Sequence, residues 1–166
     1  MLLEEFFDYK NLLMKELCSN ETIVRMVTGK DDVRIPNHDL AYTQIFPFEY
    51  LPETVDEGKT FICFDEDIVK VPNKTFYIPV LYIWAFTHKS RMRRTGGGLL
   101  LDDLAVEINK MLNGSRYYGL GELRLDSAKR FSPISDFQGR VLTYYTQDFN
   151  RPSGMRRSPS NRKDGV

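Results

Sequence analysis

Four basic side chains, three consecutive glycines and two adjacent carboxylates lie close together between residues 88 and 112. The segment reads HKSRMRRTGGGLLLDDLAVEINKML, and the basic residues that precede its glycines are Lys89, Arg91, Arg93 and Arg94. A basic, glycine-rich turn that leads into a helix is an arrangement that binds phosphate groups in nucleotide-dependent proteins. The first question is therefore whether this segment is a phosphate-binding loop.

The spacing of the glycines does not match a nucleotide-binding pattern. A Walker-type loop needs a lysine directly after its last glycine, whereas Gly98 is followed by leucines, and the dinucleotide pattern G-x-G-x-x-G is not completed. Asp102 and Asp103 fall in the first turn of the expected helix, where they already occupy its positive end. A further anion there would cost about 1 kcal/mol for each neighbouring exposed charge. The segment is better interpreted as a mobile basic loop and a hinge into a helix.

The same acids could instead bind a metal ion. Asp103 and Glu107 would share one face of the helix, and a nuclease-type site with two metals would need further carboxylates such as Asp126 or Asp148. Nothing in the sequence requires that arrangement, and acids that are solvated at a helix start explain the pattern as well. We therefore predict no metal site.

Histidine and cysteine give no catalytic pattern. His38 and His88 each lack a second histidine at ligand spacing, and no serine or cysteine sits in a nucleophile elbow, so we expect both histidines in surface or loop positions. Cys18 and Cys63 have no C-x-x-C spacing and are predicted to be buried as small apolar side chains. These residues predict neither enzymatic activity nor a cofactor.

Charge is unevenly distributed along this chain of 166 residues, although its formal net charge is zero. Residues 151–166 contain one acid and five basic residues, so this tail carries +4 and residues 1–150 carry −4; the basic residues are Arg151, Arg156, Arg157, Arg162 and Lys163. The tail is also rich in Ser, Pro and Gly, and we expect it to be extended and disordered in isolation. Both basic segments could contact nucleic-acid phosphates without sequence preference, or acidic faces of partner proteins.

The N-terminal third of the chain predicts two helices and then an irregular stretch. Helical spacing over residues 2–17 is followed by a possible cap at Ser19 or Asn20 and a stop at Gly29. Prolines rule out a long helix between residues 30 and 58. The apolar and aromatic part of that stretch, AYTQIFPFEYLP, should pack on the core or on a neighbouring subunit.

The remainder alternates strands with one long helix. Residues 59–65 and 74–88 predict an antiparallel hairpin that turns near Pro72-Asn73, with Pro79 at a bulge or an edge. The aromatic neighbours of Trp84 should pack on a sheet face. Residues 99–112 form an amphipathic helix ended by Asn113-Gly114, and residues 117–128 and 139–150 predict two further strands.

These elements predict an α+β domain over residues 1–150: a largely antiparallel or mixed β-sheet with a long hairpin and helices packed on one face, followed by the extended basic tail 151–166. The first residues lack the basic region of a secretory signal, and the longest apolar stretch, residues 76–86, is too short to span a bilayer. We expect a soluble protein.

Two stretches of the second half carry a family resemblance. TGGGLLLDDLAVEINKMLNG, followed by YYGLGELRLDSAKRFSPISDFQGRVLTYYTQDFN, resembles the C-terminal half of bacteriophage tail-terminator and tail-completion proteins. The likeness includes the helix over residues 103–112, the G-x-G-x-L-x-L strand from Gly119 to Leu125 and the G-R-x-L-x-Y strand that closes at Asn150. It covers about residues 58–150 and contains no catalytic signature.

The resemblance implies a structural protein of the virion, assembled in the host cytoplasm. Such proteins form a ring, commonly a hexamer, that caps the tail tube and presents a docking face to the head connector or stopper protein, while genomic DNA passes through the lumen without specific recognition. Neither catalytic residues, metal nor cofactor are implied. A head-completion or stopper protein of the neck, or a sequence-independent nucleic-acid-binding module, are the alternatives.

Contacts between subunits or with partners are expected at both basic segments and at the aromatic stretch, with pairing between sheet edges as a further expectation. The candidate contact residues are His88, Lys89, Arg91, Arg93, Arg94, Phe46, Phe48, Tyr50, Arg151, Arg156, Arg157, Arg162 and Lys163.

Overall fold

The computed structural model describes residues 7–53, 58–70, 76–146 and 148–149, and it has the predicted α+β architecture. The described α-helices are α2 (Tyr9–Ser19), α3 (Glu21–Thr28) and α4 (Leu100–Leu112), and the 3-10 turns are η1 (His38–Leu40) and η3 (Lys89–Arg91). The strands are β1 (Ile45–Phe46), β2 (Thr60–Lys70), β3 (Phe76–His88), β4 (Arg124–Phe131), β5 (Phe137–Tyr145) and β6 (Asp148–Phe149). None of the described helices is long and apolar enough to cross a membrane.

The sheet is mixed. Its order is β1-β2-β3-β5-β4, with β6 paired to the start of β3. β1 runs parallel to β2, whereas the other pairings are antiparallel. β2 and β3 form the predicted long hairpin, and β2 extends five residues beyond the predicted end at Asp65. The turn predicted near Pro72-Asn73 lies outside the described residues.

Pro79 lies at an irregularity of this hairpin, as its missing N–H requires. It faces Ile68, and the register shifts directly afterwards, between Ile68 and Lys70. The bulge in β2 therefore allows a proline within a central strand, which confirms the prediction for this residue.

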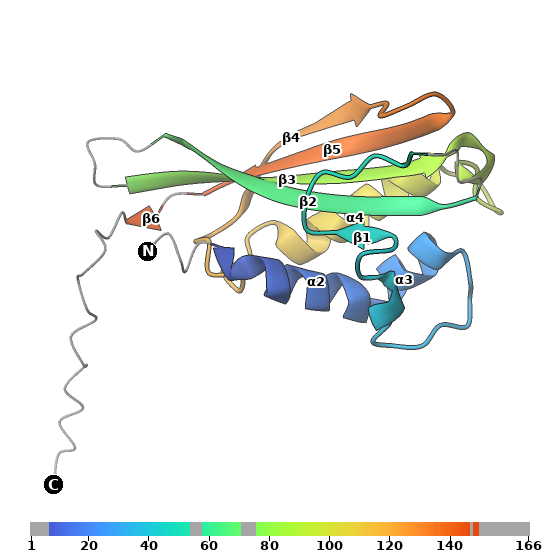
Figure 1. Ribbon diagram of the computed structural model, residues 1–166, viewed down its shortest axis with the longest axis horizontal. Helices are drawn as coiled ribbons and strands as arrows, with labels where there is room; N and C mark the ends of the chain where they lie inside the picture. The colour runs from blue at the N-terminus through green and yellow to red at the C-terminus, as the bar shows by residue number, and fades with distance from the viewer. Residues whose placement is uncertain (1–6, 54–57, 71–75, 147, 150–166) are drawn as a thin grey trace, which may run out of the picture.

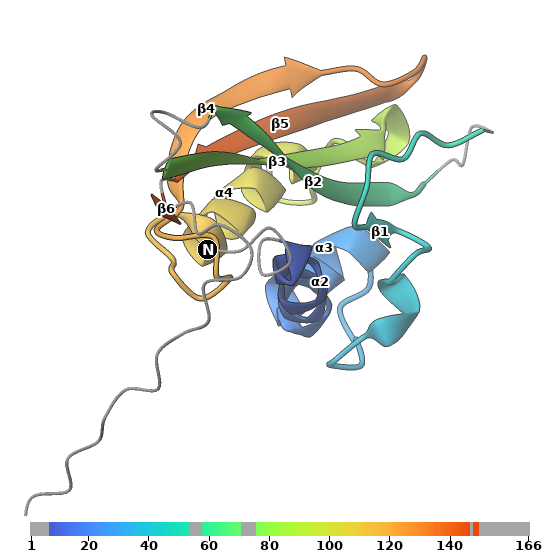
Figure 2. The same cartoon turned by 60° about the vertical axis from the view of Figure 1, so that its left-hand side comes forward.

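The α2–α3 junction is built from the predicted local signals. The Asn20 side chain accepts a hydrogen bond from the backbone N–H of Ile23 at 3.1 Å and so caps the start of α3. Gly29 ends the helix in the left-handed conformation, with φ of +69°. Both helices lie on the same face of the sheet (Figures 1 and 2).

All three α-helices cover one face of the sheet (Figures 1 and 2). The main core lies between these two layers and takes alternate residues from each strand, such as Ile62 and Phe64 from β2 and Ile83 and Ala85 from β3. α4 contributes its predicted apolar stripe, and its acids lie on the opposite side. The helices on one face are thus confirmed.

The other face of the sheet, which the helices leave open, has a smaller aromatic cluster at one end. Phe61, Phe86 and Phe137 are buried there, together with Phe46 from β1. Trp84 stacks on Tyr82 further along β3, with ring centroids 5.7 Å apart. The predicted packing of these aromatic residues on a sheet face is confirmed.

The strand predicted over residues 117–128 is wrong in its position, because β4 begins at Arg124 and ends at Phe131. Gly119 and Gly121 both have positive φ, so the chain before Leu123 forms turns. Leu123 is buried and Leu125 is exposed, although residues two apart in one strand would point the same way. The strand predicted over residues 139–150 is divided: β5 covers Phe137–Tyr145, and β6, Asp148–Phe149, pairs with β3.

Candidate interaction surfaces

The basic loop that follows β3 is fastened to the body of the protein by Arg91. Its guanidinium donates hydrogen bonds to the backbone oxygens of Met26 (2.9 Å) and Val27 (3.0 Å) and to the Thr60 hydroxyl (2.7 Å). The two backbone oxygens belong to the last turn of α3, where a cation also complements the helix dipole. Arg91 therefore positions the loop and is occupied internally.

Two of the other basic side chains of the loop are held by carboxylates. Lys89 contacts Asp136 at 2.5 Å, and Arg94 contacts Asp103 at 2.5 Å. Both pairs are exposed to solvent, so each contributes little to stability. Arg93 is exposed and has no ion pair within the described part of the chain.

A polar groove of about 690 Å³ separates this loop from α3. Its lining includes four arginines, Arg25, Arg91, Arg93 and Arg94, and one acid, Asp31. Because Arg25 is paired with Glu21 and Arg94 with Asp103, two of the four arginine charges around the groove are balanced by carboxylates.

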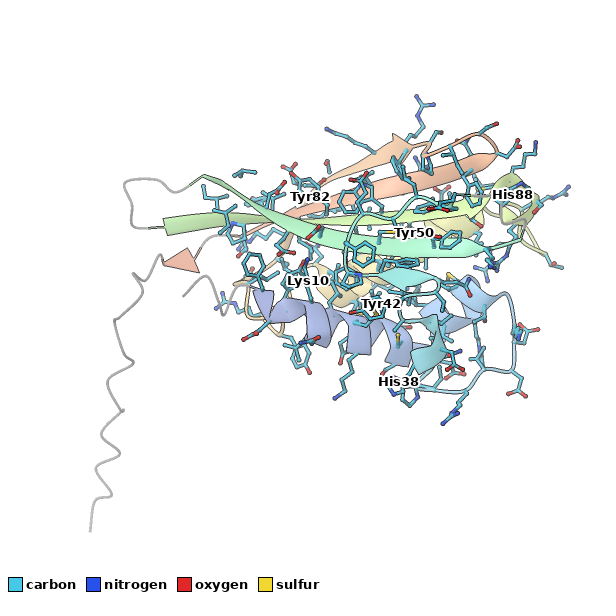
Figure 3. All side chains as sticks on the ribbon, viewed as in Figure 1. Lys10, His38, Tyr42, Tyr50, Tyr82 and His88 are labelled. Atoms are coloured by element: carbon cyan, nitrogen blue, oxygen red, sulfur yellow. The ribbon has the colours of Figure 1, made fainter. Side chains whose placement is uncertain are left out.

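His88 is not the surface residue that the sequence suggested, because only 4% of it is exposed. Its Nδ1 lies 2.8 Å from the Ser90 hydroxyl and accepts from the Ser90 N–H at 3.3 Å, and its ring packs edge-on against Phe137. These contacts begin the 3-10 turn η3. The other histidine, His38, lies at an exposed position in η1, as expected (Figure 3).

The acids at the start of α4 pair with two different arginines. Asp102 accepts two hydrogen bonds from Arg140 on β5, at 2.8 and 3.1 Å, and Asp103 is held by Arg94. These contacts tie the helix start to the sheet and to the basic loop. Among the described residues, no group of three or more His, Cys, Asp or Glu side chains could hold a metal ion.

The aromatic stretch after β1 is divided between the core and the surface. Phe46 is buried and stacks on the half-buried Tyr50, with ring centroids 4.0 Å apart. Phe48 is 43% exposed and Tyr42 is 63% exposed, and their rings lie 6.4 Å apart. Exposed aromatic side chains that neighbour one another are typical of protein interfaces.

Both margins of the sheet have strand edges without a partner strand among the described residues. β4 is paired only with β5, and β2 is paired with β1 only at Ile62 and Cys63. The outer edges of residues 64–70 and of β4 are therefore available for pairing with another chain. Leu125 and Tyr145 are exposed large side chains beside the β4 edge.

A buried acid lies on the helix side of β2. The Glu66 side chain is 1% exposed, accepts a hydrogen bond from the Tyr9 hydroxyl and lies 3.6 Å from the Lys10 ammonium. Burial, and secondarily the charge of Asp67, raise the pKa of Glu66 to about 7. The Lys10 ammonium lies closer to the carboxylate of Asp65, at 2.8 Å, than to that of Glu66.

Both cysteines are free and buried, as predicted. Burial raises the pKa of Cys18, and it raises the pKa of Cys63 to about 12, where the nearby charge of Glu49 adds to the effect. Both thiols are therefore protonated and unreactive at neutral pH.

Several interacting residues were not foreseen from the sequence. The pairs Lys89–Asp136 and Asp102–Arg140 join residues that are 47 and 38 positions apart in the sequence, so no local sequence pattern predicts them. The basic tail residues Arg151, Arg156, Arg157, Arg162 and Lys163 lie outside the described residues.

Comparison with known proteins adds one match. The protein-family model described as YomW matches residues 20–146, which includes every described element except α2 and β6. No curated protein matches the chain.

Proposed function

The chain belongs to the YomW family, which is derived from bacteriophages, and from this premise we propose that this phage protein is a ring-forming tail terminator at the head–tail junction. In this role it caps the finished tail tube, blocks the addition of further tube subunits and presents the docking face for the head connector. The mechanism is geometric and makes or breaks no covalent bond.

The observation that carries the proposal is the two strand edges, at opposite margins of one sheet, that have no partner strand among the described residues. A cyclic ring needs two different surfaces on each subunit, placed so that one meets the other on the next copy. β4 supplies one such surface, with Leu125 and Tyr145 exposed nearby, and the β1–β2 side supplies the other, with Tyr42 and Phe48 exposed nearby.

The state of the basic loop favours this role over the alternative of a nucleic-acid-binding module. Such a module needs several cations that are free to replace the counterions of phosphates. Arg91 is bound to α3, and Lys89 and Arg94 are held by carboxylates. A loop that is fixed in this way is suited to forming a contact with a neighbouring protein in a ring whose lumen DNA passes through without being bound.

Oligomeric state is the first test. Size-exclusion chromatography with light scattering, followed by electron microscopy, should show closed rings of uniform copy number. A monomer at every soluble concentration, together with a steeply salt-dependent gel shift on DNA, would favour the binding module instead.

The phenotype of a phage that lacks the gene separates a terminator from a stopper. Loss of a terminator should give tails of uncontrolled length that do not join heads. Loss of a head-completion or stopper protein should leave tails of normal length beside heads that release their DNA. Electron microscopy of the lysates distinguishes the two outcomes.

A further inference from the structure

The two unpaired strand edges carry opposite charge. The outer part of β2, residues 64–70, contains one base, Lys70, and two acids on the open face, Asp65 and Asp67, while its third acid, Glu66, is buried toward the helices. β4 contains three bases, Arg124, Lys129 and Arg130, and one acid, Asp126. The strand order places β2 and β4 toward opposite margins of the sheet, with β3 and β5 between them.

Asp65 is held by Lys10 at 2.8 Å, but one further charge on each edge has no ion-pair partner within the described part of the chain. Asp67 and Lys129 are both exposed, and neither forms an ion pair among the described residues. Asp67 also borders a shallow hollow that is lined by Glu49, Asp65, Tyr82 and Trp84, so the open face beside the β2 edge is acidic and aromatic. Figure 3 shows Tyr82 on the face of the sheet away from the helices.

Strand direction allows the two edges to pair between copies. β2 is antiparallel to β3, β3 to β5 and β5 to β4, so β2 and β4 run in opposite directions. A rotation about an axis along the strands preserves each direction, and it therefore brings β4 of one copy beside β2 of the next in antiparallel orientation.

The alternation of side chains then restricts the register. Lys129 shares the open face with Cys63 through the row Lys129–Val141–Trp84–Cys63, and Asp65 and Asp67 have the same parity on β2. A slip by one residue would place the buried face of one strand on the open face of the next. When the open faces of the two copies lie on the same side of the joined sheet, Lys129 lies opposite Asp65 or Asp67 in the unpaired part of β2.

We propose that β4 of one copy pairs antiparallel with residues 64–68 of β2 in the next copy, with Lys129 facing Asp65 or Asp67 across the interface. This inference rests on the proposed ring and names the surface that closes it. Bulges at Asp126 and at Val69 limit the regular segments to residues 127–131 and 64–68, five residues on each edge. These bulges limit how far any strand can pair along either edge.

Charge reversal tests the contact. Lys129→Glu and Asp67→Lys each place like charges across the interface, and we expect each to weaken ring assembly at least about tenfold in light scattering. An equimolar mixture of the two variants restores opposite charges at every junction of an alternating ring, so rings of even copy number should return. Lys15→Glu makes the same charge change at an exposed position of α2 and should assemble normally.

Cross-linking tests the same pairing without a change of charge. The double variant Asp67→Cys with Lys129→Cys should give a ladder of covalent multimers on oxidation, because each copy can link to both neighbours, whereas either single variant should stop at a dimer. Circular dichroism of each variant checks that the fold is retained.

The outcomes separate this interface from the ring itself. Wild-type rings that are insensitive to both reversals and give no ladder would overturn the interface and leave the ring intact. A wild-type chain that stays monomeric at all concentrations, with no ladder from the double variant, would overturn both proposals.

Discussion

At the scale of single residues, Arg91 shows how one half-buried cation can have a structural role within a basic loop. Replacing it with alanine removes donors from the backbone oxygens of Met26 and Val27 and from the Thr60 hydroxyl. We expect Arg91→Ala to lower the free energy of unfolding by about 2–4 kcal/mol, because hydrogen bonds from a charged donor are lost together. Arg93→Ala, two residues away and exposed, should change it by less than about 0.5 kcal/mol.

Urea denaturation at neutral pH measures both changes. Equal stability of the two variants would mean that water replaces the guanidinium at the end of α3, and that Arg91 is free to act as a surface contact.

Glu66 is a residue whose titration should govern part of the pH dependence of stability. Its pKa of about 7 in the folded protein lies above the ordinary value of 4.5, so the folded state keeps a proton that the unfolded state has released. The stabilising effect of that proton is complete below pH 4.5 and is lost as the pH rises through 7. A pKa shift from 4.5 to about 7 corresponds to a loss of about 3 kcal/mol.

Glu66→Gln should remove this loss and retain an acceptor for the Tyr9 hydroxyl. Wild type and variant should therefore have similar stability at pH 4.5, and the variant should be more stable at pH 8. Denaturation series at several pH values test this, with Glu107→Gln on α4 as a surface control. A parallel pH dependence of wild type and Glu66→Gln would show that another group is responsible.

At the scale of elements, the contact between β3 and β5 depends on a glycine within a strand. A Cβ added at Gly139 would lie 2.7 Å from the backbone oxygen of Ala85 and 2.8 Å from the Cβ of Phe86. These atoms belong to the paired strand and cannot move independently. Gly139→Ala should therefore destabilise the protein by about 2–3 kcal/mol.

Gln138→Ala, at the neighbouring exposed position of β5, is the matched control and should be close to neutral. Thermal and urea unfolding compare the two variants. A stable Gly139→Ala protein would imply that β5 can separate from β3 at this end.

How far the sequence predicts each element depends on whether its determinants are local. The cap at Asn20 and the stop at Gly29 lie within one helical turn of α3, and the sequence showed both. The start of β4 depends instead on Gly119 and Gly121. Their positive φ values form turns where the alternation of apolar and polar residues predicted a strand. Contacts such as Glu66 with Tyr9, 57 residues apart, require the sheet and α2 to be in place before they exist.

At the scale of the whole molecule, the proposed ring should depend on the exposed aromatic residues beside the β2 edge as well as on charge. Phe48 is 43% exposed in the single chain, and burying the remainder against a neighbouring copy would contribute about 1–2 kcal/mol at each junction. Phe48→Ser should therefore raise the concentration needed for rings by about tenfold or more, because every junction is weakened together.

Val106→Ser on the outer side of α4 is the control, since Val106 is 53% exposed but lies away from both strand edges. Mass photometry over a dilution series gives the assembly midpoint of each variant, and urea denaturation of the dilute chain separates assembly from folding. If Phe48→Ser and Val106→Ser assemble alike, the aromatic side chains beside β2 face solvent in the ring. The contact between copies must then be confined to the strand edges, which the charge reversals at Asp67 and Lys129 examine independently.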